Sequence, residues 1–169
     1  RPRDMDLGAQ LPHGALRVYV MGDRGAKQEP ATDQDIFKMA ALAREAMRDG
    51  ALGFSTSHTL NHKTADGNNT PSYGAAEKEL VGIAMGLKQA GLGVLQVVSD
   101  FPGGEREFGV LRRMVEASVR PLSVSVGQAH VAPNSYKNIL GWLKQANDDG
   151  LQMRAQVCGR PVGILLGLE

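Results

Sequence analysis

Polar side chains that could bind or transform a small molecule follow the apolar runs of this sequence in four places. They are Ser55-Thr56-Ser57-His58 with the long segment after it, Ser99-Asp100, Gln128 with His130, and Gln156 with Cys158 and Arg160. In parallel α/β proteins the carboxyl ends of the strands meet at one edge of the sheet and form the functional site. The pattern therefore predicts a pocket for a small-molecule substrate.

Two of these residues have side chains suited to proton transfer. Asp100 comes just after the apolar run 93–98, and His130 follows the next such run. A carboxylate at such a position could act as a general base or orient a substrate. Asp100 could equally cap the helix expected after Gly104, and His130 could be a loop histidine without a catalytic role. We take both as candidate catalytic residues.

The segment from Ser57 to Ala76 is long for a connection between a strand and the next helix. Connections of this length are usually functional or disordered, so we expect this one to contact substrate. Its run of turn-forming residues, 66–69, would also suit a plain surface loop. The candidate substrate-binding residues are Ser57, His58, His62 and Asp66 in this segment, and Gln128 and Gln156 after later strands.

Two further features bear on metal binding and nucleophilic chemistry. His58 and His62 are four residues apart, which on a helix would place two metal ligands on one face. The Gly, Asn and Pro residues nearby argue against a helix there. Cys158 fits a small buried apolar side chain better than a nucleophile, because the sequence implies no adjacent base. We therefore assign no metal ligand from these residues.

The elements that must position these side chains alternate between helix and strand. We predict helices from the Thr32 cap to Gly50, over 75–90, over about 105–118, and from the Asn134-Ser135 cap to Gly150. Short apolar or β-branched runs follow them at 51–56, 93–98, 122–126 and 151–157. This alternation favours parallel strands joined by right-handed crossovers.

The last two strands alternate apolar with polar residues, which is unusual for a flat sheet buried on both faces. In a barrel, small polar groups can point into the lumen; the candidates are Ser123, Ser125, Gln152 and Gln156. We therefore predict an α/β fold, a partial (β/α)8 TIM-type barrel of about four βα repeats, with residues 1–169 an incomplete fragment of the barrel domain. A small complete open sheet, with a phosphate or nucleotide at the glycine-rich turns 23–25 and 102–104, is the alternative.

Composition excludes several classes of function. The net charge is +1, with 19 basic and 18 acidic residues well mixed, so we expect no nucleic-acid partner. No apolar run is long enough to span a membrane, and we expect no membrane partner. A single cysteine excludes an intrachain disulfide and fits a cytoplasmic location. Open strand edges in a partial barrel lead us to expect self-association.

One run of residues resembles a known family. Asp49-Gly50-Ala51-Leu52-Gly53-Phe54-Ser55-Thr56-Ser57 is similar to the Gly-Ala-x-Gly-x-Ser-Thr-Gly segment of the amidohydrolase family that includes N-acyl-D-amino-acid deacylases. The resemblance continues through residues 62–67, the strand at 95–101 and the stretch 155–161. It covers most of the chain after about Leu11.

This resemblance implies a metal-dependent barrel that hydrolyses amide or other non-peptide C–N bonds, N-acyl amino acids being the first class to expect. It implies a divalent metal, zinc first, which holds a hydroxide for attack on the carbonyl. The family's His-x-His motif and catalytic Asp have no counterpart in this chain, so the resemblance assigns no metal ligand within it.

The sequence also departs from the family pattern. The family places histidines at the ends of two mid-barrel strands, whereas 97–100 and 125–128 contain none, and Ser57 replaces a glycine. A non-catalytic, metal-free binding protein that retains the barrel is therefore the second hypothesis.

Overall fold

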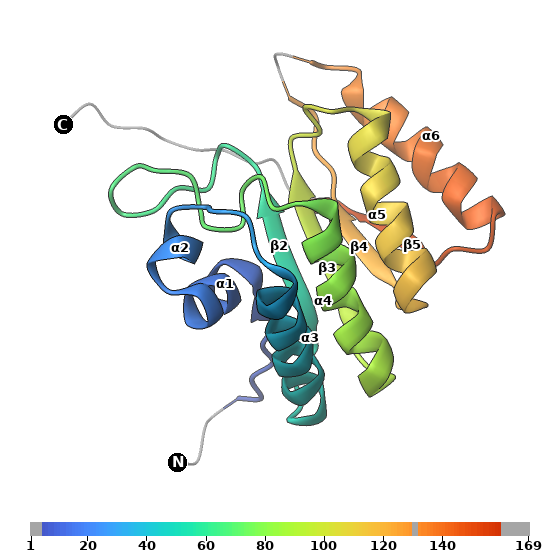
Figure 1. Cartoon of the computed structure of the whole chain (residues 1–169). Helices are drawn as coiled ribbons and strands as arrows, with labels where there is room; N and C mark the ends of the chain where they lie inside the picture. Colours follow the sequence, from blue (N-terminus) through green and yellow to red (C-terminus); the bar gives the residue numbers. More distant parts are fainter. Residues whose placement is uncertain (1–4, 130–131, 160–169) are drawn as a thin grey trace.

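A computed structural model describes residues 5–129 and 132–159 and shows one parallel sheet covered by helices (Figure 1). The strands are β1 (Leu11–Pro12), β2 (Gly53–His58), β3 (Val94–Ser99), β4 (Leu122–Ser125) and β5 (Met153–Gln156). The helices are α1 (His13–Met21), α2 (Asp23–Ala26), α3 (Asp33–Arg48), α4 (Glu77–Ala90), α5 (Glu105–Ser118) and α6 (Ser135–Asp148). In the described ranges, no helix is long and apolar enough to cross a membrane.

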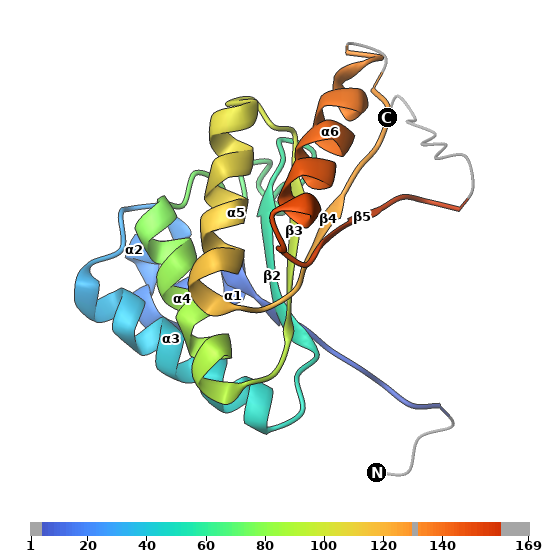
Figure 2. The same ribbon diagram turned by 90° about the vertical axis from the view of Figure 1, so that its right-hand side faces the viewer.

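The strand order identifies the architecture. Each strand pairs in parallel with the next one along the chain, in the order β1-β2-β3-β4-β5. The helices α3, α4, α5 and α6 all lie on one side of the sheet (Figure 2). A doubly wound sheet would reverse its strand order and carry helices on both faces. The prediction of a partial barrel with parallel strands is therefore confirmed.

Four predicted helices and four predicted strands are present, but the prediction of about four repeats is one strand short. The two-residue β1 pairs with β2 through Leu11 and Phe54 and through Pro12 and Ser55. It was too short to give a periodic signal. Helix α1 was also missed, because Pro12 at its N-cap position makes no side-chain cap and the first turn has no acidic residue. The predicted glycine-rich turn at 23–25 is the short helix α2.

The capping box predicted at the start of α3 is confirmed. The backbone N–H of Asp35 donates to the Thr32 hydroxyl, and the backbone N–H of Thr32 donates to the Asp35 carboxylate at 2.9 Å. These bonds and the neighbouring Arg24 hold the pKa of Asp35 below its ordinary value. The same spacing that identified the cap in the sequence therefore fixes where α3 begins.

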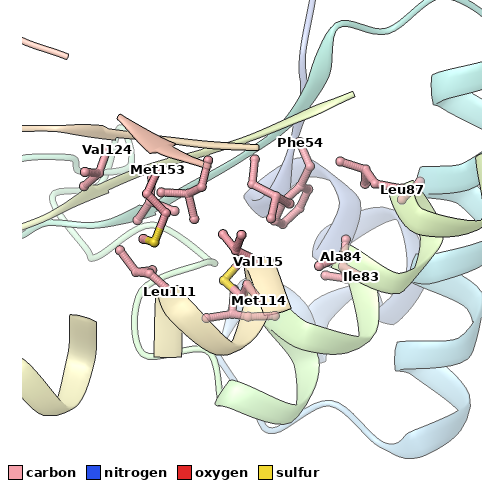
Figure 3. Close-up of a cluster of buried hydrophobic side chains, with 14 of the residues drawn as sticks. Phe54, Ile83, Ala84, Leu87, Leu111, Met114, Val115, Val124 and Met153 are labelled. Atoms are coloured by element: carbon pink, nitrogen blue, oxygen red, sulfur yellow. The ribbon is translucent and has the colours of Figure 1, made fainter. Parts of the chain in front are cut away.

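The hydrophobic core lies between the sheet and the helices (Figure 3). Phe54 and Met153 point from the strands into the layer occupied by Ile83 of α4 and Met114 of α5. Helices α3 and α4 approach so closely that a Cβ atom on Gly86 would lie 2.2 Å from the carbonyl oxygen of Ala40. This packing anchors the strands and leaves their other face available for function.

The opposite face of the sheet carries mainly polar side chains. Strand register aligns Ser55 with Gln96, Gln96 with Ser123, and Ser123 with Arg154. The next row aligns Ser57 with Val98, and Ser125 with Gln156. Ser123, Ser125 and Gln156, which were predicted to face a barrel lumen, lie on this face of the sheet, whereas Gln152 lies before β5 begins. A barrel turns this face toward its lumen.

Candidate active-site groove

A groove of about 690 Å³ opens on the polar face of the sheet, beside its β1 edge. Strands β2 and β3 form its floor, α1 forms one wall, and the segment between β2 and α4 forms another. The lining residues include Pro12, Val18, Ser55, Ser57, His62, Pro71, Ser72, Gln96 and Val98. Its size lies within the range of about 300–1,000 Å³ common for small-molecule sites.

Ser57 and His62 meet in this groove. The Oγ atom of Ser57 lies 2.7 Å from Nδ1 of the His62 ring. Ser57 comes from β2, and its carbonyl oxygen accepts a hydrogen bond from the Ser72 hydroxyl at 3.0 Å. The structure thus brings together two of the residues predicted to bind substrate, one from a strand and one from the following loop.

Asp100 fixes the position of that loop. Its Oδ1 accepts from the Thr59 hydroxyl at 2.6 Å, and its Oδ2 accepts from the Leu60 backbone N–H at 2.8 Å. The alternative role as a helix cap is wrong, because Gly104 occupies the N-cap of α5 and no side chain caps it. The catalytic role predicted for Asp100 stays a prediction; what the structure shows is an anchor two residues before His62.

His58 points away from the groove. Side chains alternate along β2, so His58 faces the helices while Ser57 faces the polar side. It lines a separate cavity of about 110 Å³ together with Glu107 and residues of α4 and α5. Its Nε2 is buried and has no hydrogen-bond partner among the described residues. Burial lowers the pKa of His58, and His13 adds to the lowering, while Glu107 and Glu79 act in the opposite direction.

Three of the remaining predicted residues lie outside the groove. Asp66 is exposed in a turn at the tip of the long segment, and Gln128 donates to the carbonyl of Pro133 at 3.0 Å. Gln156 accepts from the Ser123 hydroxyl at 3.3 Å on the polar face. His130 lies outside the described residues.

Sequence reasoning missed a buried polar network behind the groove. His13 Nε2 lies 2.7 Å from the Glu79 carboxylate, and His13 Nδ1 lies 2.8 Å from the Thr56 hydroxyl. Because a carboxylate only accepts, Nε2 carries the ring proton and Thr56 donates to Nδ1. Arg17 donates to both Glu79 oxygens, at 2.9 and 3.1 Å. A signal did exist: Glu79 stands four residues before Ile83 on the apolar stripe of α4.

The side chains in the described ranges do not fit a metal centre by themselves. No group of three or more His, Cys, Asp or Glu residues there could hold a metal ion. His58 and His62, whose four-residue spacing had suggested a metal pair before the nearby residues argued against it, line different cavities on opposite sides of the sheet. Cys158 is exposed rather than buried, which corrects the interpretation as a core side chain.

Comparison with known proteins decides the family. The amidohydrolase family model matches residues 1–167. The chain belongs to the amidohydrolase family. No curated protein matches it.

Three solved structures share the fold of this amidohydrolase chain, and all are D-aminoacylases. One, studied for its binuclear metal centre, with one-metal activation and second-metal attenuation, is 21% identical with a TM-score of 0.68. Another, described as defining a novel subset of amidohydrolases, is 24% identical with a TM-score of 0.62. A D-aminoacylase variant in complex with copper chloride is 21% identical, with a TM-score of 0.68. In each case the match covers 86% of this chain and 28% of the D-aminoacylase chain.

Proposed function

We propose that this amidohydrolase-family protein hydrolyses an amide or other non-peptide C–N bond, with N-acylated amino acids as the first substrates to test. The observation that carries the proposal is the groove beside Ser57 and His62, on the sheet face that a barrel turns inward. Family membership supplies the reaction class. D-aminoacylases, which share the fold, supply the first substrate class.

The groove offers the contacts that such a substrate needs. Ser57, His62 and Gln96 present hydroxyl, imidazole and amide groups that hydrogen-bond a carbonyl, an amide N–H or a carboxylate. Val18, Pro71 and Val98 provide apolar surface for an acyl chain. In this proposal the chain binds and orients the substrate.

A divalent metal, zinc first, would supply a hydroxide nucleophile at neutral pH when bound. Because the described residues form no ligand set, the proposal names no residue of this chain as a ligand. The cytoplasmic location, the self-association and the incomplete-domain prediction also remain proposals.

The test uses the complete protein that carries this sequence. N-acyl-D- and N-acyl-L-amino acids are incubated with it, and the released amine is measured before and after chelation and zinc replacement. We expect turnover that chelation abolishes and zinc restores. Gln96→Leu should raise KM, whereas Ser125→Ala, on the same face but outside the groove, should not. If folded, zinc-loaded protein cleaves none of these N-acyl amino acids, the proposal is wrong.

A binding protein without catalysis is the second candidate. It is favoured by the ends of β3 at Ser99 and β4 at Ser125, where the carboxylates are already engaged. Asp100 accepts from Thr59 and Leu60, and Glu107 accepts from Ser99 and Gly103. It predicts saturable binding of N-acyl amino acids by calorimetry, with no product and no retained metal.

A further inference from the structure

We infer that Ser57 is a nucleophile activated by His62, and that the groove carries out acyl transfer through a covalent acyl-serine intermediate. This inference goes beyond the proposed amide hydrolysis, because the step requires no metal. The substrates are esters or activated amides of small carboxylic acids.

The distance between the two groups suits proton transfer. A nucleophile and its general base are expected to lie about 2.6–3.2 Å apart. The Oγ–Nδ1 separation of 2.7 Å falls inside that range. Ser57 is half-buried and His62 exposed, and both line the groove. The Ser57–His62 pair is therefore on the surface of the groove, where a substrate carbonyl would bind.

Neighbouring strands and a hydrogen-bonded turn hold Ser57 and His62 in position. Ser57 lies in β2, which pairs with β1 on one side and β3 on the other. His62 follows a turn in which Asp100 accepts two hydrogen bonds and the Asn61 N–H donates to the Thr59 hydroxyl at 3.2 Å. Catalytic groups need this kind of support, because a displacement of about half an ångström weakens their geometry.

The reaction balances with the groups present. Ser57 Oγ attacks the carbonyl carbon while its proton passes to His62 Nδ1. The bond to the leaving oxygen or nitrogen then breaks, and the leaving group takes that proton. Water then attacks the carbonyl carbon of the acyl-serine and gives one proton to His62. The ester bond to Ser57 breaks, the carboxylic acid leaves, and Ser57 Oγ takes the proton back from His62. Gln96 lines the same groove, and in this proposal its side-chain amide N–H donates to the developing oxyanion.

Active-site labelling tests the inference directly. The complete protein, treated with chelator, is incubated with a fluorophosphonate probe and analysed by peptide mass spectrometry. We expect one adduct, in which the Ser57 oxygen bonds to phosphorus as fluoride leaves. Ser57→Ala should abolish it. His62→Gln should slow it by about 10²-fold or more, the usual contribution of a general base.

Ser125→Ala is the matched control, since Ser125 lies on the same sheet face without a hydrogen bond to a histidine in the described chain. It should label as the parent does. Circular dichroism checks that each variant is folded. An adduct elsewhere, no adduct, or an unchanged rate in His62→Gln would overturn the inference. The labelling uses chelator-treated protein. A failed labelling would therefore count against the acyl-serine intermediate and not against metal-dependent amide hydrolysis.

Discussion

His13 Nε2 lies 2.7 Å from Glu79 Oε1 in the interior, joining α1 to α4 although 66 residues separate them in the chain. His13 and Glu79 are each 1% exposed and Arg17 is 2% exposed. Because Thr56 of β2 is bonded to the same ring, this cluster attaches the wall of the groove to its floor.

Removing the carboxylate should be costly. Glu79→Ala leaves the Arg17 guanidinium buried without its counter-ion, and we expect a loss of about 3–5 kcal/mol of stability. Urea denaturation of the complete protein measures it. The control is Lys78→Ala, one residue earlier, whose ion pair with Asp33 is exposed. Equal denaturation midpoints for the two variants would show that the buried cluster contributes little.

Stability should fall as the pH drops below about 6.5. Burial holds the pKa values of His13 and His58 below the ordinary 6.5, although Glu79 acts against this at both rings and Glu107 at His58. Arg17 lowers the pKa of His13, and His13 lowers the pKa of His58. Between 6.5 and the lowered folded values, the unfolded chain binds protons that the folded chain does not. Above about pH 7 both histidines are neutral in the folded and in the unfolded chain, so they add no further pH dependence to the stability. Denaturation midpoints across this pH range provide the measurement.

The substitution His58→Leu distinguishes the contribution of His58 to the pH dependence of stability from that of His13. The substitution removes a buried ring nitrogen that has no partner in the described residues, so stability at pH 7 should be unchanged or higher. The decline below pH 6.5 should become shallower, because one of the two depressed sites is gone. A steep loss of stability at pH 7 would mean that His58 makes an interaction that its position does not reveal.

Asp100 should influence the groove by holding the loop that carries His62. Asp100→Ala removes the acceptors for Thr59 and Leu60, and hydrogen exchange at the Leu60 amide should accelerate markedly. Labelling of Ser57 should slow, because His62 loses its support. Asp66→Ala, in the exposed turn of the same segment, should change neither readout. Unchanged exchange at Leu60 with lost activity would instead support direct catalysis by Asp100.

The α3–α4 contact should tolerate no added methyl group. In Gly86→Ala the new Cβ meets the Ala40 carbonyl at 2.2 Å, a backbone atom that cannot turn aside, so we expect a loss of about 1–3 kcal/mol. Gly141→Ala is the matched control on α6, with nothing within 4 Å. It should stabilise by about 0.5–1 kcal/mol, since alanine favours a helix. Thermal melts of the two variants should move in opposite directions.

Local signals explain what the sequence could predict. Thr32 with Asp35 marked the start of α3, and Gly91, with φ of 69°, marked the end of α4. Helix α1 escaped because its buried side includes His13 and Arg17, which break an apolar stripe. Glu79 reaches these polar side chains from another helix and hydrogen-bonds both of them.

The site was predictable in part. Ser57 and His62 were expected in one pocket and do meet. His58 was expected beside them, but β2 extends to His58, and strand alternation places that ring on the far face. The bonds from Thr59 and Leu60 to Asp100 span about forty residues of sequence, so no spacing rule could have indicated them.

The order of the sheet bears on how the protein is made. Every strand in the described sheet pairs with its immediate predecessor, so no strand inserts between two already formed. As synthesis proceeds, each new strand and helix meets a completed partner surface at the growing edge. Pairing therefore never waits for a strand that is made later than the next one along the chain. The chain is suited to assembly by accretion during translation, one unit at a time.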